Sequence, residues 1–452
     1  MTTSVMWFRG DLRLIDQPAL REAVAAGPDG VVPLYVLDDR LWGRGAGVRT
    51  AYLSRLLSEF DERIGGLHVV HGPPEREVPR VAHAAGADSV HVSASFTPYG
   101  TSRDDRVEKA LDVPLVRTGS AYAVSPGRVV KGDGEGYRVF TPFYKGWLDH
   151  GWRDPAPAVR DVPWLRPEGR THRIPEAGVP EDVTLPPIGE RAAREHWRRW
   201  LEDHVTDYAD ERDHPGLDTT SRMSVHLKWG SIHPRTMLAD LAPLGSDGAA
   251  AYRRELAFRE FYADILHQRP DSAFGYYDRR FEHLQYDEPA DDLEAWKRGE
   301  TGFPIVDAGM RQLLAEGWMH NRVRMIVASF LVKDLHLEWT HGAAHFLDRL
   351  VDADLASNQH GWQWVAGCGT DASPFFRVFN PVTQSKKFDP DGAYIRRWVP
   401  ELAGVSAPAV HEPWTMADPP QDYPAPLVDH AEERREALRR FEALRRFEAL
   451  TR

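Results

Sequence analysis

The sequence has a single cysteine, Cys368, among 452 residues, so it can form no intramolecular disulfide, which fits a reducing compartment. No uninterrupted apolar run approaches the roughly 18 residues that a membrane-spanning helix needs. The first residues lack the basic and apolar regions of a secretory signal, so we expect a cytoplasmic protein that does not bind membranes. Lys and Arg total 56 against 68 for Asp and Glu. The resulting formal net charge of −12 gives no overall indication of a nucleic-acid partner.

The motifs of several enzyme classes are also missing. The 20 histidines include no His-Glu-x-x-His pair, and Cys368 has no cysteine partner, so we expect no metal site. No glycine-rich loop follows the first predicted strand, and no Walker lysine precedes a Ser or Thr. These absences argue against zinc chemistry, dinucleotide binding and P-loop catalysis. The one compositional excess is in tryptophan, with 15 residues.

The first 125 or so residues alternate short apolar runs with helical patterns. The runs at 5–8, 31–37, 67–71 and 89–93 are typical of buried strands, and helices are predicted over 18–26, 48–64, 74–85 and 102–111. This βαβα order predicts a Rossmann-like parallel sheet. Residues 154–188 hold eight prolines and are expected to form an extended linker. After Glu190 the pattern is helical, with helices predicted over 191–208, 250–268, 303–317, 321–335 and 340–350.

We therefore expect an α/β N-terminal domain followed by a larger all-α domain. The predicted ranges are an α/β domain at 1–125, an inter-domain linker at 126–190, a helical domain at 191–430 and a charged helical tail at 431–452. The tail contains the tandem hexapeptide Arg-Arg-Phe-Glu-Ala-Leu at 439–444 and 445–450. Its apolar residues recur every three positions and so drift around a helix, which favours a solvated helical extension over a partner-binding helix.

Two segments of the helical half carry candidate chemistry. Residues 219–224 (Thr-Thr-Ser-Arg-Met-Ser) gather hydroxyls and an arginine that could bind a phosphate, although on this segment alone ordinary capping of the next helix is the preferred explanation. Between Trp318 and Trp364 the chain holds arginines, carboxylates, an amide and indoles close together. Such a group suits a buried planar ligand, and the alternative is a structural Arg–Asp network under a tryptophan-rich core.

The motifs together resemble those of the DNA photolyase/cryptochrome family, most closely its class I cyclobutane pyrimidine dimer photolyases. They are Trp7-Phe-Arg-Gly-Asp-Leu-Arg-Leu14, Arg259-Glu-Phe-Tyr262, Thr301-Gly-Phe-Pro-Ile-Val-Asp307, Trp318-Met-His-Asn321, Asp354-Leu-Ala-Ser-Asn358 and Gly361-Trp-Gln-Trp364. The likeness runs from Met6 to about Pro424. The resemblance implies that the helical domain binds FAD. It implies a reaction in which blue light drives electron donation from reduced FAD to a flipped-out dimer. It also implies a monomeric lyase whose partner is damaged DNA.

The resemblance also assigns residues. The phosphate and ribityl region of FAD would lie among Tyr208, Thr220, Ser221, Arg222, Met223 and Ser224, with Tyr252 a further ligand, and the rings among Glu255, Arg259, Trp318, Asn321, Arg324, Asp352, Asp354 and Asn358. Asn358 would face flavin N5 and Glu255 would stabilise or protonate the lesion radical anion, with Asn321, Met325 and Trp364 completing the catalytic set. DNA contacts would come from Arg212, Phe258, Trp364, Arg377, Lys386 and Lys387.

Three features depart from the family pattern. Phe258 stands where repair enzymes usually carry a tryptophan that stacks on the dimer, which predicts lower lesion affinity. The electron-transfer chain would run through Trp362 and Trp339 to Tyr286 instead of a third tryptophan, so its last step would release a proton. Ser95-Phe-Thr-Pro-Tyr-Gly100 resembles the turn of relatives that bind 8-hydroxy-5-deazaflavin, but Ser95 and Thr97 replace expected acids. The second chromophore is therefore either that deazaflavin or methenyltetrahydrofolate.

The alternative function is a cryptochrome-like flavin photoreceptor with weak or no repair activity, which Phe258 favours. A dark flavoprotein oxidoreductase lacks a nicotinamide site, and a (6–4) photoproduct enzyme would be expected to show paired histidines where this chain has His320-Asn321. Because the net charge is negative, DNA contacts would have to come from local basic stretches, 222–235 and 377–397. We therefore expect non-specific DNA binding to be modest and sensitive to salt.

Overall fold

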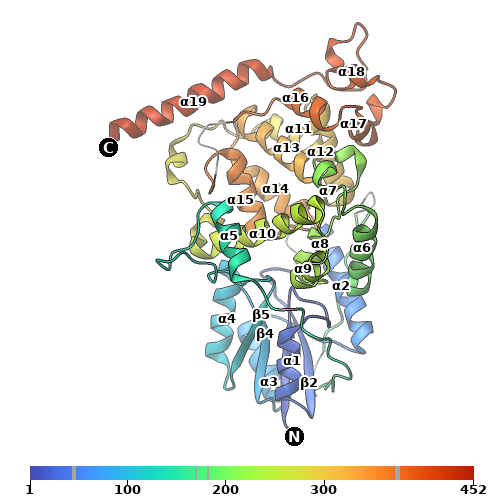
Figure 1. Ribbon diagram of the computed structural model, residues 1–452, viewed down its shortest axis with the longest axis vertical. Helices are drawn as coiled ribbons and strands as arrows, with labels where there is room; N and C mark the ends of the chain where they lie inside the picture. The colour runs from blue at the N-terminus through green and yellow to red at the C-terminus, as the bar shows by residue number, and fades with distance from the viewer. Residues whose placement is uncertain (43–46, 168–170, 181–182, 372–376, 452) are drawn as a thin grey trace. The chain divides into compact units, whose positions relative to one another are not determined.

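The computed structural model describes residues 1–42, 47–167, 171–180, 183–371 and 377–451 (Figure 1). The chain divides into two compact units. Unit 1 comprises residues 1–181, 185–206 and 221–270, and unit 2 comprises residues 182–184, 207–220 and 271–452. The helical ranges that follow the linker are thus shared between the units, whereas a single helical domain at 191–430 was expected.

Unit 1 is built on a parallel sheet with strand order β3-β2-β1-β4-β5. The strands are β1 (Thr3–Phe8), β2 (Gly30–Leu37), β3 (His68–His71), β4 (Ser89–Ala94) and β5 (Leu115–Ser120). Side chains of β1 alternate between the faces: Val5 and Trp7 join the core under α3 (Pro74–Ala84), whereas Phe8 packs edge-on against Phe60 of α2 (Val48–Ile64). The parallel α/β architecture predicted from the sequence is confirmed.

The remaining helices of unit 1 cover the sheet and extend from it. They are α1 (Pro18–Ala26), α4 (Pro98–Ala110), α5 (Phe140–His150), α6 (Gly189–Asp203), α8 (Ser224–Trp229), α9 (Pro234–Leu241) and α10 (Asp247–Gln268). Proline opens α1, α3, α4 and α9, where its missing N–H is not needed. Thr97 and Ser246 cap α4 and α10 with side-chain oxygens.

Buried carboxylates explain why the helices after the linker belong to unit 1. Glu190 of α6 accepts hydrogen bonds of 2.9 Å from the backbone N–H groups of Leu14 and Ile15. Glu260 of α10 accepts from the Trp147 indole at 2.6 Å and from Val124 N at 3.0 Å. Because a buried carboxylate is costly without such donors, these contacts fix both helices to the N-terminal part of the chain.

Three local sequence expectations differ from the structure. The predicted helix 191–208 is interrupted, because α6 ends at Asp203 and α7 (Tyr208–Glu211) begins only after a turn. In that turn the backbone oxygen of Val205 lies so close to Gly248 that a Cβ at position 248 would clash with it. The range 126–190 contains α5, whose Phe140, Phe143 and Trp147 are buried on one face. Strand β5 was not predicted. The proline-rich range 154–188 forms no helix in its described residues, with one isolated bridge from Trp164 to Val31.

Unit 2 is helical around a core that includes the buried indoles Trp296, Trp339 and Trp362. Its helices are α7, α11 (Asp291–Arg298), α12 (Pro304–Glu316), α13 (Asn321–Lys333), α14 (Trp339–Arg349), α15 (Leu355–Ala366), α16 (Pro381–Phe388), α17 (Ala393–Trp398), α18 (Ala407–Val410) and α19 (His430–Thr451). Shorter 3-10 turns include η1 (Pro215–Leu217), η3 (Arg279–His283), η4 (Pro400–Leu402) and η5 (Pro413–Thr415), and η2 (Pro270–Ala273) lies at the boundary with unit 1.

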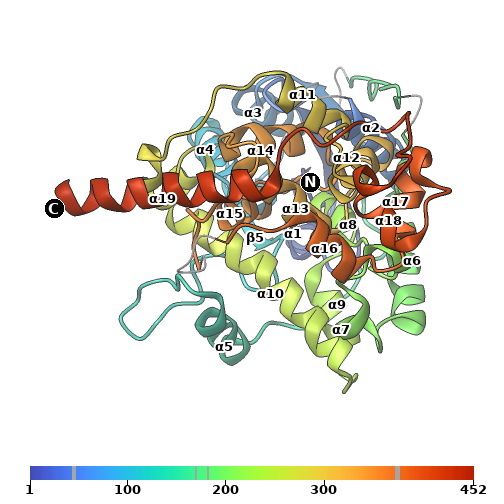
Figure 2. The same ribbon diagram turned by 90° about the horizontal axis from the view of Figure 1, so that it is seen from above.

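The C-terminal helix α19 (His430–Thr451) spans the charged tail, and one of its faces is not solvated. Ala437 and Leu444 are buried, and Phe441 packs against the core of unit 2. Its C-terminal end projects from the unit in both views (Figures 1 and 2), and Phe447 there is 45% exposed. The two copies of the hexapeptide thus occupy different environments.

Candidate functional site

The residues assigned by sequence fall into both units, and each group is described within its own unit. In unit 1 the Ser221 hydroxyl is buried and lies 2.7 Å from the Tyr252 hydroxyl, while Met223 N donates to Ser221 Oγ at 3.3 Å. Arg222 adopts a left-handed backbone conformation with φ 50°, which shapes a tight turn before α8. No side chain caps α8 among these described residues, so capping does not explain the cluster of hydroxyls.

Helix α10 carries Glu255, Phe258 and Arg259 on adjacent positions of its surface. Arg259 Nη1 donates to Ala121 O at 2.9 Å, and its guanidinium lies 4.7 Å from the centre of the Tyr122 ring. The Phe258 ring is stacked on Phe140, with 3.4 Å between the ring centres and 5° between the planes. One face of the ring predicted to stack on the lesion is therefore covered by Phe140.

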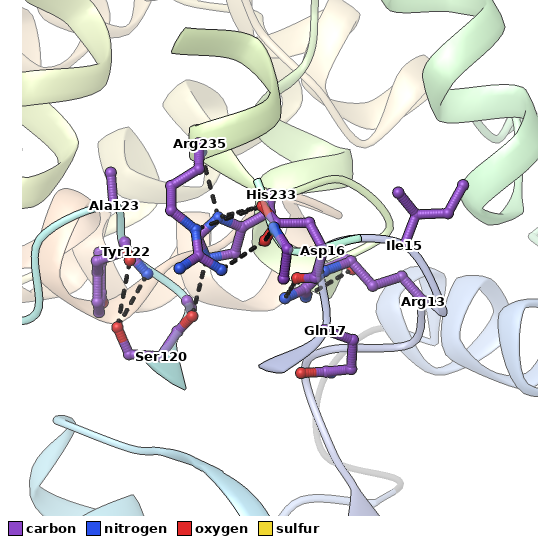
Figure 3. Close-up of polar contacts among 12 residues, drawn as sticks. Arg13, Ile15, Asp16, Gln17, Ser120, Tyr122, Ala123, His233 and Arg235 are labelled. Atoms are coloured by element: carbon purple, nitrogen blue, oxygen red, sulfur yellow. Dashed lines mark hydrogen bonds and ion pairs between the residues drawn. The ribbon is translucent and has the colours of Figure 1, made fainter. Parts of the chain in front are cut away.

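A buried polar cluster that no sequence motif indicates holds the segment that Arg259 contacts (Figure 3). Burial lowers the pKa of His233 to about 4, so its ring is neutral, and Nε2 donates to Ser120 O at 2.9 Å. Arg235 Nη2 donates to Asp16 Oδ1 at 2.6 Å. The cluster ties the end of β5, and hence Ala121, to α9 and to the loop after β1.

In unit 2 the first turn of α13 and the segment before it supply a second group. Arg324 Nη2 forms an ion pair of 2.8 Å with Asp352 Oδ2, and Arg324 Nε donates to Met319 O at 2.8 Å. The guanidinium also lies 5.9 Å from the centre of the Trp318 ring. Asn321, the first residue of α13, is exposed. The structure thus brings Trp318, Arg324 and Asp352 together.

Helix α15 supplies the third group. Asp354 caps it by accepting from Ser357 N at 2.9 Å. The Asn358 side-chain amide donates to Ala343 O at 3.1 Å and to Gln359 Oε1 at 2.9 Å. With both amide hydrogens used, the carbonyl Oδ1 is the group that Asn358 can offer to a ligand. Trp362 is buried and Trp364 is half-buried on the same helix.

Two buried polar atoms of the assigned FAD ligands have no protein partner in the described part of the chain. They are Asp352 Oδ1 and Thr220 Oγ1. Because buried polar atoms are nearly always hydrogen-bonded, each of these atoms is available to a ligand with hydroxyl, amide or ring nitrogen groups. This donor and acceptor set fits a flavin nucleotide, and it weakens the alternative of a self-satisfied Arg–Asp network.

The basic residues assigned to DNA binding differ in their environments. Arg212 lies 5.6 Å from the Tyr208 ring centre, and Lys387 4.9 Å from that of Phe388. Lys386 pairs with Glu412, which offsets its charge. Arg377 is exposed and accepts a hydrogen bond from Lys333 at its backbone oxygen. Met325 Sδ lies 3.8 Å from Arg322 Nη1, whose Nη2 pairs with Asp213 at 2.8 Å.

The proposed antenna segment in unit 1 is part of a charged and aromatic group. Thr97 caps α4 by accepting from Gly100 N at 3.1 Å, so its hydroxyl has a structural role. Tyr99 donates to Asp38, and Arg103 lies over the Trp7 ring at 5.1 Å from its centre. Arg9 pairs with Asp104 at 2.5 Å. The turn that contains Ser95 and Thr97 therefore lies beside a group of aromatic and charged side chains in which Trp7, Arg103 and Asp104 are buried.

Comparisons with known proteins cover nearly the whole chain. The sequence profile described as "DNA photolyase" matches residues 4–161, and that described as "FAD binding domain of DNA photolyase" matches residues 252–443. A protein of Streptomyces griseus named "Deoxyribodipyrimidine photo-lyase" is 42% identical over 96% of this chain and 98% of its own length. The protein of the same name from Escherichia coli K12 is 36% identical over 97% of this chain and 98% of its own length.

Solved structures give the same result. The crystal structure of a class III photolyase from Agrobacterium tumefaciens superposes with a TM-score of 0.87 at 34% identity, covering 99% of this chain and 98% of that one. An archaeal photolyase from Sulfolobus tokodaii, whose structure holds two FAD molecules, has a TM-score of 0.84 at 28% identity, covering 98% and 100%. A cryptochrome from Synechocystis sp. PCC6803 has a TM-score of 0.88 at 26% identity, covering 97% and 99%.

Proposed function

Since the chain belongs to the DNA photolyase family, we propose that it is a deoxyribodipyrimidine photo-lyase, which splits cyclobutane pyrimidine dimers in DNA under blue light. The observation that carries the proposal is the match to both family domains, at identities that relatives named for this activity share over almost their full length. Asn358, whose Oδ1 remains free to meet a flavin, supports repair over signalling. Reduced FAD, when bound, supplies the excited electron that cleaves the dimer.

The residues of the chain bind and orient that cofactor. We assign Arg324 and Asp352 to the flavin rings, with Asp352 Oδ1 as an acceptor, and Thr220 Oγ1 and Ser221 to the ribityl and phosphate region. The further ligands are those that the motifs indicate: Tyr208, Arg222, Met223, Ser224, Tyr252, Glu255, Arg259, Trp318, Asn321, Asp354 and Asn358. Trp362 and the apolar core beside it exclude water from the cofactor.

Residues on the lesion side would recognise an extruded dimer. Phe258, Met325 and Trp364 provide apolar walls, and Glu255 provides the carboxyl group that stabilises or protonates the lesion radical anion. Arg212, Arg377, Lys386 and Lys387 contact phosphates. Because the total charge is −12, affinity for undamaged DNA should be low and salt-sensitive, and the extruded lesion should supply most of the selectivity.

A second candidate function, light sensing without repair, is favoured by one observation. Phe258 offers less area than an indole, and one of its faces is covered by Phe140. The test is to incubate the reduced protein with an oligonucleotide that contains one thymine dimer, in blue light and in darkness. Thymines restored only in the light support repair. A flavin that is photoreduced normally while the dimer persists would favour the photoreceptor.

The remaining assignments concern the surroundings of the protein. We propose 8-hydroxy-5-deazaflavin as the second chromophore, because Tyr99, Arg103 and Trp7 form an aromatic and cationic group beside the Ser95–Gly100 turn. Extraction of the pigments from the purified protein tests this, and folate as the extracted pigment would contradict it.

No helix in the described parts of the chain is long and apolar enough to cross a membrane. A monomer in the cytoplasm remains our proposal for the working state.

A further inference from the structure

Tyr276 of unit 2 stands beside the proposed electron-transfer indoles. Its ring meets that of Trp339 edge to face, with 6.1 Å between the centres and 80° between the planes. Trp339 begins α14, and Gly342 on the same helix leaves room for the Trp362 ring, because a Cβ there would lie 2.1 Å from Trp362 Cη2. Trp362, Trp339 and Tyr276 therefore lie in one core, with Trp362 packed on the helix that Trp339 begins and Tyr276 in ring contact with Trp339.

The three side chains differ in whether they can lose a proton. The Nε1 atoms of Trp362 and Trp339 are buried and have no hydrogen-bond partner among the described residues. An oxidised indole at either position would thus keep its proton and remain a strong oxidant. In contrast, the Tyr276 hydroxyl donates to Glu338 Oε1 at 2.7 Å. Glu338 is half-buried at the start of α14, so a proton that it receives can pass to solvent.

Tyr286, the position that the family motifs assign to the end of the chain, lacks these features. Its hydroxyl is buried beside that of Tyr276, and no carboxylate of the described residues accepts a hydrogen bond from it. It makes no ring contact with Trp339 in the same part of the structure. Burial raises the pKa of both tyrosines, so each hydroxyl is protonated before oxidation and must lose a proton to give a stable radical. Only Tyr276 has a carboxylate in place to receive it.

We propose that Tyr276 is the terminal electron donor when the oxidised cofactor is photoreduced, and that Glu338 is its proton acceptor. The proposal rests on the proposed route through Trp362 and Trp339. Trp362 loses an electron to photoexcited oxidised FAD, and Trp339 then reduces the Trp362 radical cation. Tyr276 gives one electron to the Trp339 radical cation and, in the same step, its Oη proton to Glu338. Neutral Trp339, a neutral tyrosyl radical and a protonated carboxyl group remain.

The experiment is laser-flash absorption and electron paramagnetic resonance on the oxidised holoenzyme without oxygen. In the unchanged protein the decay of the tryptophan radical cation should show a solvent deuterium isotope effect and should yield a tyrosyl radical. Tyr276→Phe should abolish the tyrosyl signal and leave a tryptophan radical that decays by recombination. Glu338→Gln keeps a hydrogen-bond acceptor but cannot take the proton, so tyrosyl formation should slow by about tenfold or more, a barrier change of ~1.4 kcal/mol.

Tyr286→Phe is the matched control, because it removes a neighbouring buried hydroxyl and should leave the tyrosyl radical intact. Flavin content and thermal unfolding show whether each variant folds and binds its cofactor. Loss of the tyrosyl radical in Tyr286→Phe, with its retention in Tyr276→Phe, would overturn the proposal. Trp339→Phe distinguishes an error in the route from an error in the terminal donor. If formation of the tyrosyl radical is unchanged in Trp339→Phe, the route through Trp339 is wrong. If the tyrosyl radical is lost in Trp339→Phe but not in Tyr276→Phe, only the role of Tyr276 is refuted.

Discussion

Arg324 and Asp352 form an ion pair of 2.8 Å that uses only one carboxylate oxygen, so Asp352 Oδ1 is buried without a partner. Asp352→Asn would remove the charge that orients Arg324 and weaken the acceptor left for the flavin. A hydrogen bond to a charged group contributes about 1.5–3 kcal/mol, so we expect the affinity for FAD to fall by roughly tenfold to a hundredfold. Titration of the apoprotein with FAD, followed by flavin fluorescence, measures this.

The control is the pair between Arg311 and Glu401 in the same unit, which has a similar length of 2.7 Å and an arginine of similar exposure, 20% against 24% for Arg324, although Glu401 is more exposed than Asp352. Glu401→Gln breaks that pair without touching an assigned cofactor ligand, so FAD affinity should stay within twofold. If both substitutions weaken FAD binding equally, the effect of Asp352→Asn is general destabilisation and not the loss of a ligand.

Phe258 tests the lesion side. Stacking of one base on an aromatic ring is worth about 1–3 kcal/mol, so Phe258→Ala should weaken binding of a dimer-containing oligonucleotide by about tenfold. Affinity for the undamaged oligonucleotide should change little, since phosphate contacts dominate it. Phe274→Ala is the control, because Phe274 is 77% exposed and carries no assigned role. Equal losses for damaged and undamaged DNA in Phe258→Ala would remove Phe258 from lesion recognition. Binding is measured by fluorescence anisotropy in the dark.

The sequence predicted those parts of the fold whose signal is local. Helices α1 and α2 have the expected bounds, because proline or a hydrophobic period marks their ends. Strand β5 was missed because Arg117 and Thr118 make it polar, and the structure shows the reason: it is an edge strand with alternating exposure. Helix α5 was missed because its buried face, Phe140 to Trp147, sits in a range dominated by proline and glycine.

Contacts between distant positions could not be predicted in the same way. Tyr276 and Glu338 are 62 residues apart, and Arg235 and Asp16 are 219 residues apart. No periodicity or spacing connects such residues, so their hydrogen bonds appear only in the folded chain. The candidate ligands were found because family motifs name them, whereas the stacking of Phe258 on Phe140 and the use of both Asn358 amide hydrogens were not foreseeable.

We expect His345 to contribute to the loss of folding stability at acidic pH. It packs edge-on against Trp296, its Nε2 is buried without a partner among the described residues, and burial lowers its pKa to about 4. Because the unfolded chain binds a proton near pH 6.5 and the folded chain does not, stability is lost as pH falls from about 6.5 to 4 and is unaffected below that range. The lowered pKa of His345 corresponds to a decrease in the free energy of unfolding on the order of 3 kcal/mol across this pH range.

His345→Phe should therefore flatten the dependence of the free energy of unfolding on pH between 6.5 and 4, and change it by about 1 kcal/mol or less at pH 7, where the wild-type ring is neutral. Urea titrations at several pH values measure the slope. His83→Phe is a control, because His83 lies in the last turn of α3 and is exposed. An unchanged slope in His345→Phe would show that His345 ionises in the folded protein as readily as in the unfolded chain.

The tandem hexapeptide of α19 provides its own comparison, since Phe441 and Phe447 hold the same place in its two copies. Phe441 packs on the core of unit 2, with its ring 6.1 Å from that of Phe281, whereas Phe447 is 45% exposed. Phe441→Ala should lower the free energy of unfolding of the holoenzyme by about 1–3 kcal/mol through lost burial, and Phe447→Ala by about 0.5 kcal/mol or less. Denaturant unfolding followed by tryptophan fluorescence distinguishes them. Equal effects would mean that α19 does not dock on the core in solution, and a larger effect of Phe447→Ala would mean that the second copy makes the contact.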